Sequence, residues 1–308
     1  MRTRSVVGLA AVSVVAASAA LAACTPAGDD AAPLPSGVAQ HLTAELRQDR
    51  TQYADRRAKL HVVNGSDHAV TLLGGTLDAP GYGPSSPDGT ARAREVPPGV
   101  GRDVRLRLGE IDCDAEPPAA LTGAEAQRTP VATATVVVAA GWPTGDTTAA
   151  GTAVEVEVVD PLARLAAVHH EACAERLVAS GVTLRVTEVR GGDVPTPDGE
   201  APGGRITLAV EPVPGGPDVR LAEVSGTTLL SPAAGTAWAG DDLAGDGRVV
   251  LDVVPARCDP HVVAEDKRGT FLPVHAEVDG APQPVIYVPM TDQQRAAVYD
   301  LVHDACGW

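Results

Sequence analysis

Hydrophobic and polar residues alternate in short runs along most of this chain, as they do in β-strands. Valines alternate with glutamates over residues 154–158, and valine and leucine alternate with arginines over residues 104–108. Successive side chains of a strand point to opposite faces of a sheet, so each run predicts one buried and one solvated face. Asn64-Gly65 between two apolar runs predicts a tight hairpin turn, and the proline- and glycine-rich residues 78–100 predict a loop.

Helical periodicity is limited to a few short segments. Apolar residues recur every three positions from Leu162 to Val168, which predicts a helix that ends near Cys173. A second helix is predicted over residues 292–306. Apolar residues four positions apart predict a third, weaker helix over residues 36–47.

The second half of the chain repeats the order of the first. The stretch before Cys258 resembles that before Cys113, and the two predicted helices end in His-Glu-Ala-Cys at 170–173 and His-Asp-Ala-Cys at 303–306. This recurrence predicts a divergent tandem duplication. We therefore predict a mainly all-β protein with two tandem immunoglobulin-like β-sandwich domains, each with a short C-terminal helix held by a disulfide.

The N-terminus has the organisation of an export signal. Arg2 and Arg4 precede an apolar run over residues 6–21, which is shorter than the roughly 20 residues that span a membrane. The run ends in Leu-Ala-Ala-Cys at residues 21–24, which resembles the lipobox of bacterial lipoproteins. The resemblance implies diacylglycerol on the Cys24 thiol and cleavage before it. Additional fatty chains such as palmitate are expected, because one acyl chain anchors a protein only marginally.

The resulting domain plan has four parts. These are a cleaved signal peptide over residues 1–23, a flexible tether over 24–40, a first immunoglobulin-like domain over 41–178 and a second over 179–308.

Four cysteines besides Cys24 are predicted to form disulfides, because an exported chain with an even number favours bridges over metal or redox sites. No CxxC pair occurs, which argues against zinc and thioredoxin-like centres. Four cysteines allow three pairings, and the duplication favours one bridge within each repeat. The predicted bridges are Cys113–Cys173 and Cys258–Cys306.

Composition narrows the set of partners. The net charge is −16, which argues against nucleic acid and against direct attraction to anionic lipid headgroups. Only Lys59 and Lys267 are lysines, and the alanine, glycine and proline content is typical of a high-GC bacterium. With its lipobox and its Cys-Asp-Pro-His (258–261) and His-Asp-Ala-Cys (303–306) motifs, the chain resembles uncharacterised exported lipoproteins of high-GC Gram-positive bacteria. That resemblance implies a place in the cell envelope and no known activity.

Motifs for catalysis and metal binding are incomplete. His169-His170-Glu171 is not followed by the second histidine of a zinc-protease helix, because position 174 is alanine. The acidic stretch 241–247 resembles a calcium loop but has alanine and valine at two ligand positions, so a hairpin turn is preferred and a loose calcium site is the alternative. Serine-hydrolase and phosphate-loop motifs do not occur. We predict no cofactor, no metal site and no catalytic residues.

The sequence thus predicts a cell-surface lipoprotein, held by Cys24 on the extracytoplasmic face of the membrane. Its expected role is non-enzymatic binding of a protein, glycan or small ligand through the sandwich loops or the interdomain cleft. The alternative is a structural envelope protein that spaces or scaffolds a partner. An enzyme with a site assembled from distant histidines and acidic loops is the least favoured hypothesis.

Overall fold

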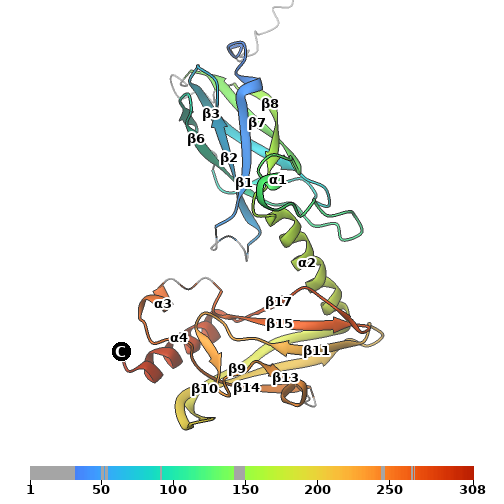
Figure 1. Cartoon of the computed structure of the whole chain (residues 1–308), viewed down its shortest axis with the longest axis vertical. Helices are drawn as coiled ribbons and strands as arrows, with labels where there is room; N and C mark the ends of the chain where they lie inside the picture. Colours follow the sequence, from blue (N-terminus) through green and yellow to red (C-terminus); the bar gives the residue numbers. More distant parts are fainter. Residues whose placement is uncertain are drawn as a thin grey trace, which may run out of the picture.

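The chain forms two β-domains joined by a long helix (Figure 1). The computed structural model describes residues 32–49, 52, 55–90, 92–141, 150–243, 247–264, 266 and 268–308. The predicted signal peptide and Cys24 lie outside the described residues, so lipidation stays a prediction. Of the helices within the described ranges, none has the length and hydropathy needed to cross a bilayer.

The first domain consists mainly of strands. Within the residues that the structure describes, the bounds of its elements are η1 Ala39–His41, β1 Leu42–Arg47, β2 Arg57–Asn64, β3 Val70–Asp78, β4 Ser86–Pro87, β5 Arg94–Val96, β6 Gly101–Arg107, α1 Gly123–Ala126, β7 Ala132–Ala140 and β8 Thr152–Val159. The strands follow the order β4-β6-β2-β1-β8-β7-β3-β5. β1 lies where the two sheets of the sandwich meet, because it pairs antiparallel with β2 and parallel with β8. The groups β1-β2-β6-β4 and β8-β7-β3 reproduce the two sheets of an immunoglobulin-like domain.

The second domain has the same plan. Its elements are β9 Val182–Thr196, β10 Gly199–Pro212, β11 Val219–Val224, β12 Leu230–Pro232, β13 Trp238–Ala239, η3 Gly240–Leu243, β14 Arg248–Pro255, α3 His261–Ala264, β15 Phe271–Val278, β16 Ala281–Pro282, β17 Ile286–Pro289 and α4 Asp292–Cys306. One sheet has the order β9-β10-β14-β12, and the other contains β13-β11-β15 with β16 and β17 paired to β15.

Each described strand of the first domain has a counterpart in the second. In each domain the third strand is followed by a short strand that pairs with the sixth strand in the other sheet (β4 with β6, β12 with β14). A second short strand follows and pairs with the third strand itself (β5 with β3, β13 with β11). Only β16 has no counterpart among the described strands. The prediction of two tandem immunoglobulin-like sandwiches is confirmed, and the shared topology is the arrangement that a tandem duplication produces.

The helix that joins the domains, α2 Arg164–Gly181, belongs to both hydrophobic cores. Leu165 and Val168 pack in the core of the first domain, whereas Ala174 and Val178 pack in the core of the second. The helix therefore runs past its predicted end near Cys173, because its apolar positions continue on the face that the second domain covers. The predicted boundary between residues 178 and 179 falls inside this shared helix.

Both predicted disulfides are confirmed. Cys113 is bonded to Cys173 in α2, and Cys258 is bonded to Cys306 at the end of α4. Each bridge ties the segment after the sixth strand of its domain, β6 or β14, to the helix that follows the last strand of the same domain.

The prediction of a helix over residues 36–47 is wrong. Apart from η1, this segment forms β1, in which Leu42, Ala44 and Leu46 are buried and the residues between them are not. A four-residue spacing of leucines fits a strand as well as a helix when the alanine midway is also a core residue. Val38 is fully buried as well, so the end of the predicted tether over 24–40 packs on the first domain.

Candidate functional site

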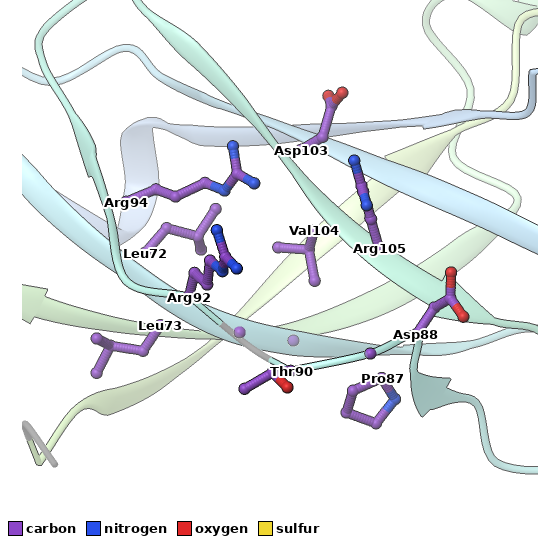
Figure 2. Close-up of a pocket in the computed structure, with 13 residues that line it drawn as sticks. Leu72, Leu73, Pro87, Asp88, Thr90, Arg92, Arg94, Asp103, Val104 and Arg105 are labelled. Carbon is purple, nitrogen blue, oxygen red and sulfur yellow. The ribbon is translucent and has the colours of Figure 1, made fainter.

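A cavity of about 360 Å³ opens in the first domain between β3 of one sheet and β6 of the other. This volume lies in the range of small-ligand sites. We call the cavity the arginine pocket, because Arg92, Arg94 and Arg105 line it (Figure 2). Its remaining lining residues are Leu72, Leu73, Gly74, Gly75, Pro87, Asp88, Gly89, Thr90, Asp103 and Val104.

The strand register places these groups at the opening of the sandwich. β5 pairs with β3 so that Arg94 lies opposite Leu72. A bulge in β3 at Leu73, between Leu72 and Gly74, interrupts the pairing with β7, and bulges often lie beside binding sites. The turn on the far side contains Gly89, whose φ of +83° suits glycine. Segments that lie far apart in sequence thus form one cavity.

The three arginines form no ion pair with any other described residue. Within the described part of the chain, the side chains of Arg92, Arg94 and Arg105 form no ion pair and no hydrogen bond, and all three are exposed. Figure 2 shows Arg92 and Arg94 extending toward β6, which carries Arg105. Guanidinium groups gathered without anions repel one another, and each presents a fork of donors that matches a carboxylate or phosphate. The pocket is therefore suited to an anionic ligand.

The carboxylates that line the pocket are engaged elsewhere. Asp88 pairs with Arg57 at 3.8 Å and with Arg107 at 3.6 Å. Asp103 lies 2.7 Å from Nδ1 of His61. Because Asp88 is directed at Arg57 and Arg107 and Asp103 at His61, neither acid forms an ion pair with the three pocket arginines.

A larger cleft of about 690 Å³ runs along α2 between the domains. Arg268 spans it, with its guanidinium 3.5 Å from Glu171 on α2 and 4.3 Å from the centroid of the Tyr287 ring. Arg176 on α2 donates to the carbonyl of Ile111 at 3.0 Å. These cations already serve contacts within and between the domains, so the cleft is a weaker candidate for a ligand site.

Ser225, Glu223 and His275 form the cluster that most resembles a hydrolase site. Ser225 Oγ lies 2.6 Å from Glu223 Oε1 and 3.2 Å from His275 Nε2. In a catalytic triad the histidine lies between the acid and the serine, with one ring nitrogen facing each. Here the nearest glutamate oxygen lies 3.8 Å from the same Nε2 that faces the serine. The arrangement does not orient the imidazole to take a proton from Ser225.

His169 is a structural residue. It is 3% exposed, and its Nε2 lies 3.0 Å from the carbonyl oxygen of Asp112. The ring of Tyr82 packs edge-on against it, and the Tyr82 hydroxyl donates to the carbonyl of Leu165 at 2.5 Å. Burial, reinforced by the charge of Asp160, raises the pKa of Tyr82. This cluster fixes the start of α2 in the first domain.

The other sequence candidates also have structural surroundings. In the Cys-Asp-Pro-His segment, Asp259 Oδ1 accepts from the backbone N–H of His261 at 3.0 Å, which is a local turn. The calcium-like loop lies partly outside the described residues, at 244–246. In the ranges that are described, no group of three or more histidines, cysteines, aspartates or glutamates could hold a metal ion.

Sequence reasoning missed the arginine pocket. The signal was present as five arginines in residues 92–107 of an acidic chain. The local pattern places Arg92 and Arg94 in the loop predicted over residues 78–100, and Arg105 and Arg107 on the solvated face of the following strand. Their convergence follows from the way β3, β5 and β6 assemble, which a single sequence does not display.

Comparison with known proteins gives no family. No protein-family model and no curated protein matches the chain. Among solved structures, the chain is similar to the E. coli chaperone DraB, with 10% identity, a TM-score of 0.18 and coverage of 81% of this chain and 97% of that one. It is also similar to the D0-D1 domain of intimin, with 14% identity, a TM-score of 0.15 and the same coverage. The exo-chitosanase CsxA of Amycolatopsis orientalis has 11% identity, a TM-score of 0.16 and coverage of 75% of this chain and 25% of that one. Likenesses with TM-scores this low carry no argument about function.

Proposed function

We propose that this protein is an extracytoplasmic lipoprotein, anchored through Cys24, that binds an anionic ligand without transforming it. The observation that carries the proposal is the set of three exposed arginines around one cavity of the first domain, none of which forms an ion pair with another described residue. The Leu-Ala-Ala-Cys motif at residues 21–24 supports the anchor. The Ser225 cluster lacks the geometry of a nucleophilic triad, which favours binding over catalysis.

The anchor predicts a difference between two cysteine variants. Cys24→Ala should move the protein from the detergent phase to the aqueous phase in phase partitioning and abolish labelling by radioactive palmitate, because no acyl chain can attach. Cys113→Ala breaks the Cys113–Cys173 bridge but leaves Cys24 in place as the acyl acceptor, so this variant should partition as the wild type does. Partitioning of the Cys24→Ala variant into detergent would contradict the anchor.

The pocket predicts that two arginines dominate the affinity for a small polyanion. Arg92→Gln/Arg94→Gln should bind tripolyphosphate at least tenfold more weakly than the wild type in calorimetric titration at low salt. The reason is that a hydrogen bond to a charged group contributes about 1.5–3 kcal/mol, and about 1.4 kcal/mol is a factor of ten in affinity.

The matched control is Arg185→Gln/Arg190→Gln on β9, which removes the same charge from the second domain. Its affinity for tripolyphosphate should change less than twofold. If the wild type binds no tripolyphosphate, or if both double variants lose affinity equally, the pocket is not the site.

A scaffolding role is the second candidate, and α2 favours it. Because one helix is buried in both cores, the two domains are held at a fixed separation, as a spacer requires. If cells that carry Arg92→Gln/Arg94→Gln grew like wild-type cells while cells without the protein did not, this role would be favoured over ligand binding.

A further inference from the structure

The outer face of the sheet beside the arginine pocket carries cations in register. Arg47 of β1 lies directly opposite Lys59 of β2, and Lys59 lies directly opposite Arg105 of β6. We call Arg47, Lys59 and Arg105 the cation row. Adjacent strands are about 4.8 Å apart, so the row spans roughly 10 Å across three strands.

Folding alone does not account for this row. Like charges directly opposite each other in a sheet are destabilising. Glu45 pairs with Arg47 at 2.9 Å and Asp49 pairs with Lys59, but Arg105 has no ion pair within the described residues. The next pair along the strands, Arg57 and Arg107, also places two cations opposite each other, and these two share Asp88 as a partner. A chain of net charge −16 thus gathers five cations on one face of one sheet.

Charges on this face are sorted by row. Glu45, His61 and Asp103 occupy the three positions that neighbour the cation row along the strands. Two residues along a strand correspond to roughly 6.7 Å, so a line of cations runs beside a line that contains two carboxylates. A broad anionic surface laid on the sheet would meet both lines, whereas a narrow chain can follow the cations alone.

The cation row and the pocket share one residue. Arg105 is the third member of the row and also lines the pocket with Arg92 and Arg94. A path of positive charge therefore leads from β1 across β2 and β6 into the cavity. One small anion would fill only the end of that path.

We propose that the ligand is a linear polymer with repeated anionic groups, which lies along the cation row and places one group in the arginine pocket. This inference rests on the proposed function and specifies its ligand class. The described residues that line the pocket include no aromatic side chain. Nucleic-acid bases would find no stacking platform there, so the polymer is one without flat bases, with phosphates or carboxylates as its charged groups.

Variants of the row separate polymer binding from binding of a small anion. Arg47→Gln/Lys59→Gln leaves the pocket intact and should weaken the binding of long-chain polyphosphate at least tenfold while changing tripolyphosphate affinity less than twofold. The plot of log affinity for the long chain against log salt should become shallower by roughly 1.4, at about 0.7 for each lost contact to a flexible chain. Thermal unfolding should shift little, because the relief of repulsion between the two cations offsets the loss of their surface pairs with Glu45 and Asp49.

The control is again Arg185→Gln/Arg190→Gln, in which the 188–190 ion pair repeats the two-residue spacing of the 45–47 pair. This variant should bind long-chain polyphosphate as the wild type does. Alginate serves as the carboxylate probe. If Arg47→Gln/Lys59→Gln also weakens alginate binding, the cation row recognises linear polyanions with either carboxylates or phosphates.

Three results would overturn the inference. The first is equal wild-type affinity for tripolyphosphate and long-chain polyphosphate, which would leave the small-anion pocket standing and remove the polymer. The second is an unchanged affinity of Arg47→Gln/Lys59→Gln for the long chain. The third is tighter binding of a single-stranded oligonucleotide of equal charge, or of vesicles with anionic lipids, than of either polymer. Absence of binding to every anion would instead remove the proposed function itself.

Discussion

Val178→Asp should unfold the second domain at temperatures where the wild type is folded. Val178 is 1% exposed and packs in the core of the second domain from the last turns of α2. A carboxylate at this position has no cation among the core residues to pair with. Burial of an unpaired charge is among the most destabilising changes, so the free energy of unfolding should fall by roughly 4 kcal/mol or more. Scanning calorimetry should show the transition of the second domain at a much lower temperature.

The neighbouring residue provides the control. Leu177 is 43% exposed on the same helix, so Leu177→Asp introduces the same side chain at a position where solvent can hydrate its charge. It should change stability by about 0.5 kcal/mol or less, as surface substitutions generally do. Equal destabilisation by both variants would show that helix α2 does not pack on the second domain as described.

Removal of the Cys113–Cys173 bridge should destabilise the first domain by about 4 kcal/mol. The bridge closes a loop of 60 residues, and the chain-entropy model gives this magnitude for a loop of that length. The expected result for Cys113→Ala/Cys173→Ala is a lower transition temperature of the first domain, measured by calorimetry without reductant. The Cys258–Cys306 bridge closes 48 residues, so its removal should act on the second domain with a similar magnitude.

Reductant tests the origin of this effect. If the loss comes from the cross-link, dithiothreitol should lower the stability of the wild type to that of the double alanine variant and leave the variant unchanged. A variant that stays less stable than the reduced wild type would indicate that packing of the cysteine side chains, rather than the cross-link, supplies the stability.

Strong local patterns allowed much of the fold to be predicted. The alternation over residues 104–108 and 154–158 is confirmed by β6 and β8, and the recurrence of the cysteine segments is confirmed by two bridges within the repeats. The segment 36–47 was misread because Ala44 contributes too little hydrophobicity to reveal a two-residue period. In its counterpart in the second domain, β9, Val182, Leu184 and Val186 occupy the alternate positions and make the two-residue period visible.

The candidate site could not be predicted, because it depends on register. Lys59 and Arg105 lie 46 positions apart in the chain and become neighbours only when β2 pairs with β6 in one alignment. A shift of one residue would turn one of them to the opposite face. The disulfide pairing could be predicted from the sequence, because the duplication favours one bridge within each repeat. That inference does not depend on how the strands pair.

The position of β1 has a mechanical consequence for a protein tethered at its N-terminus. β1 is the first strand after residue 32 and is bonded on both edges, to β2 over six residue pairs and to β8 in parallel. A pull on that end along the strand direction loads these hydrogen bonds in shear, so they must fail together and not one after another. The arginine pocket lies in this same domain. Tension between an anchor at Cys24 and a polymer held at the pocket would therefore pass through the first sandwich alone, and the second would bear none of it.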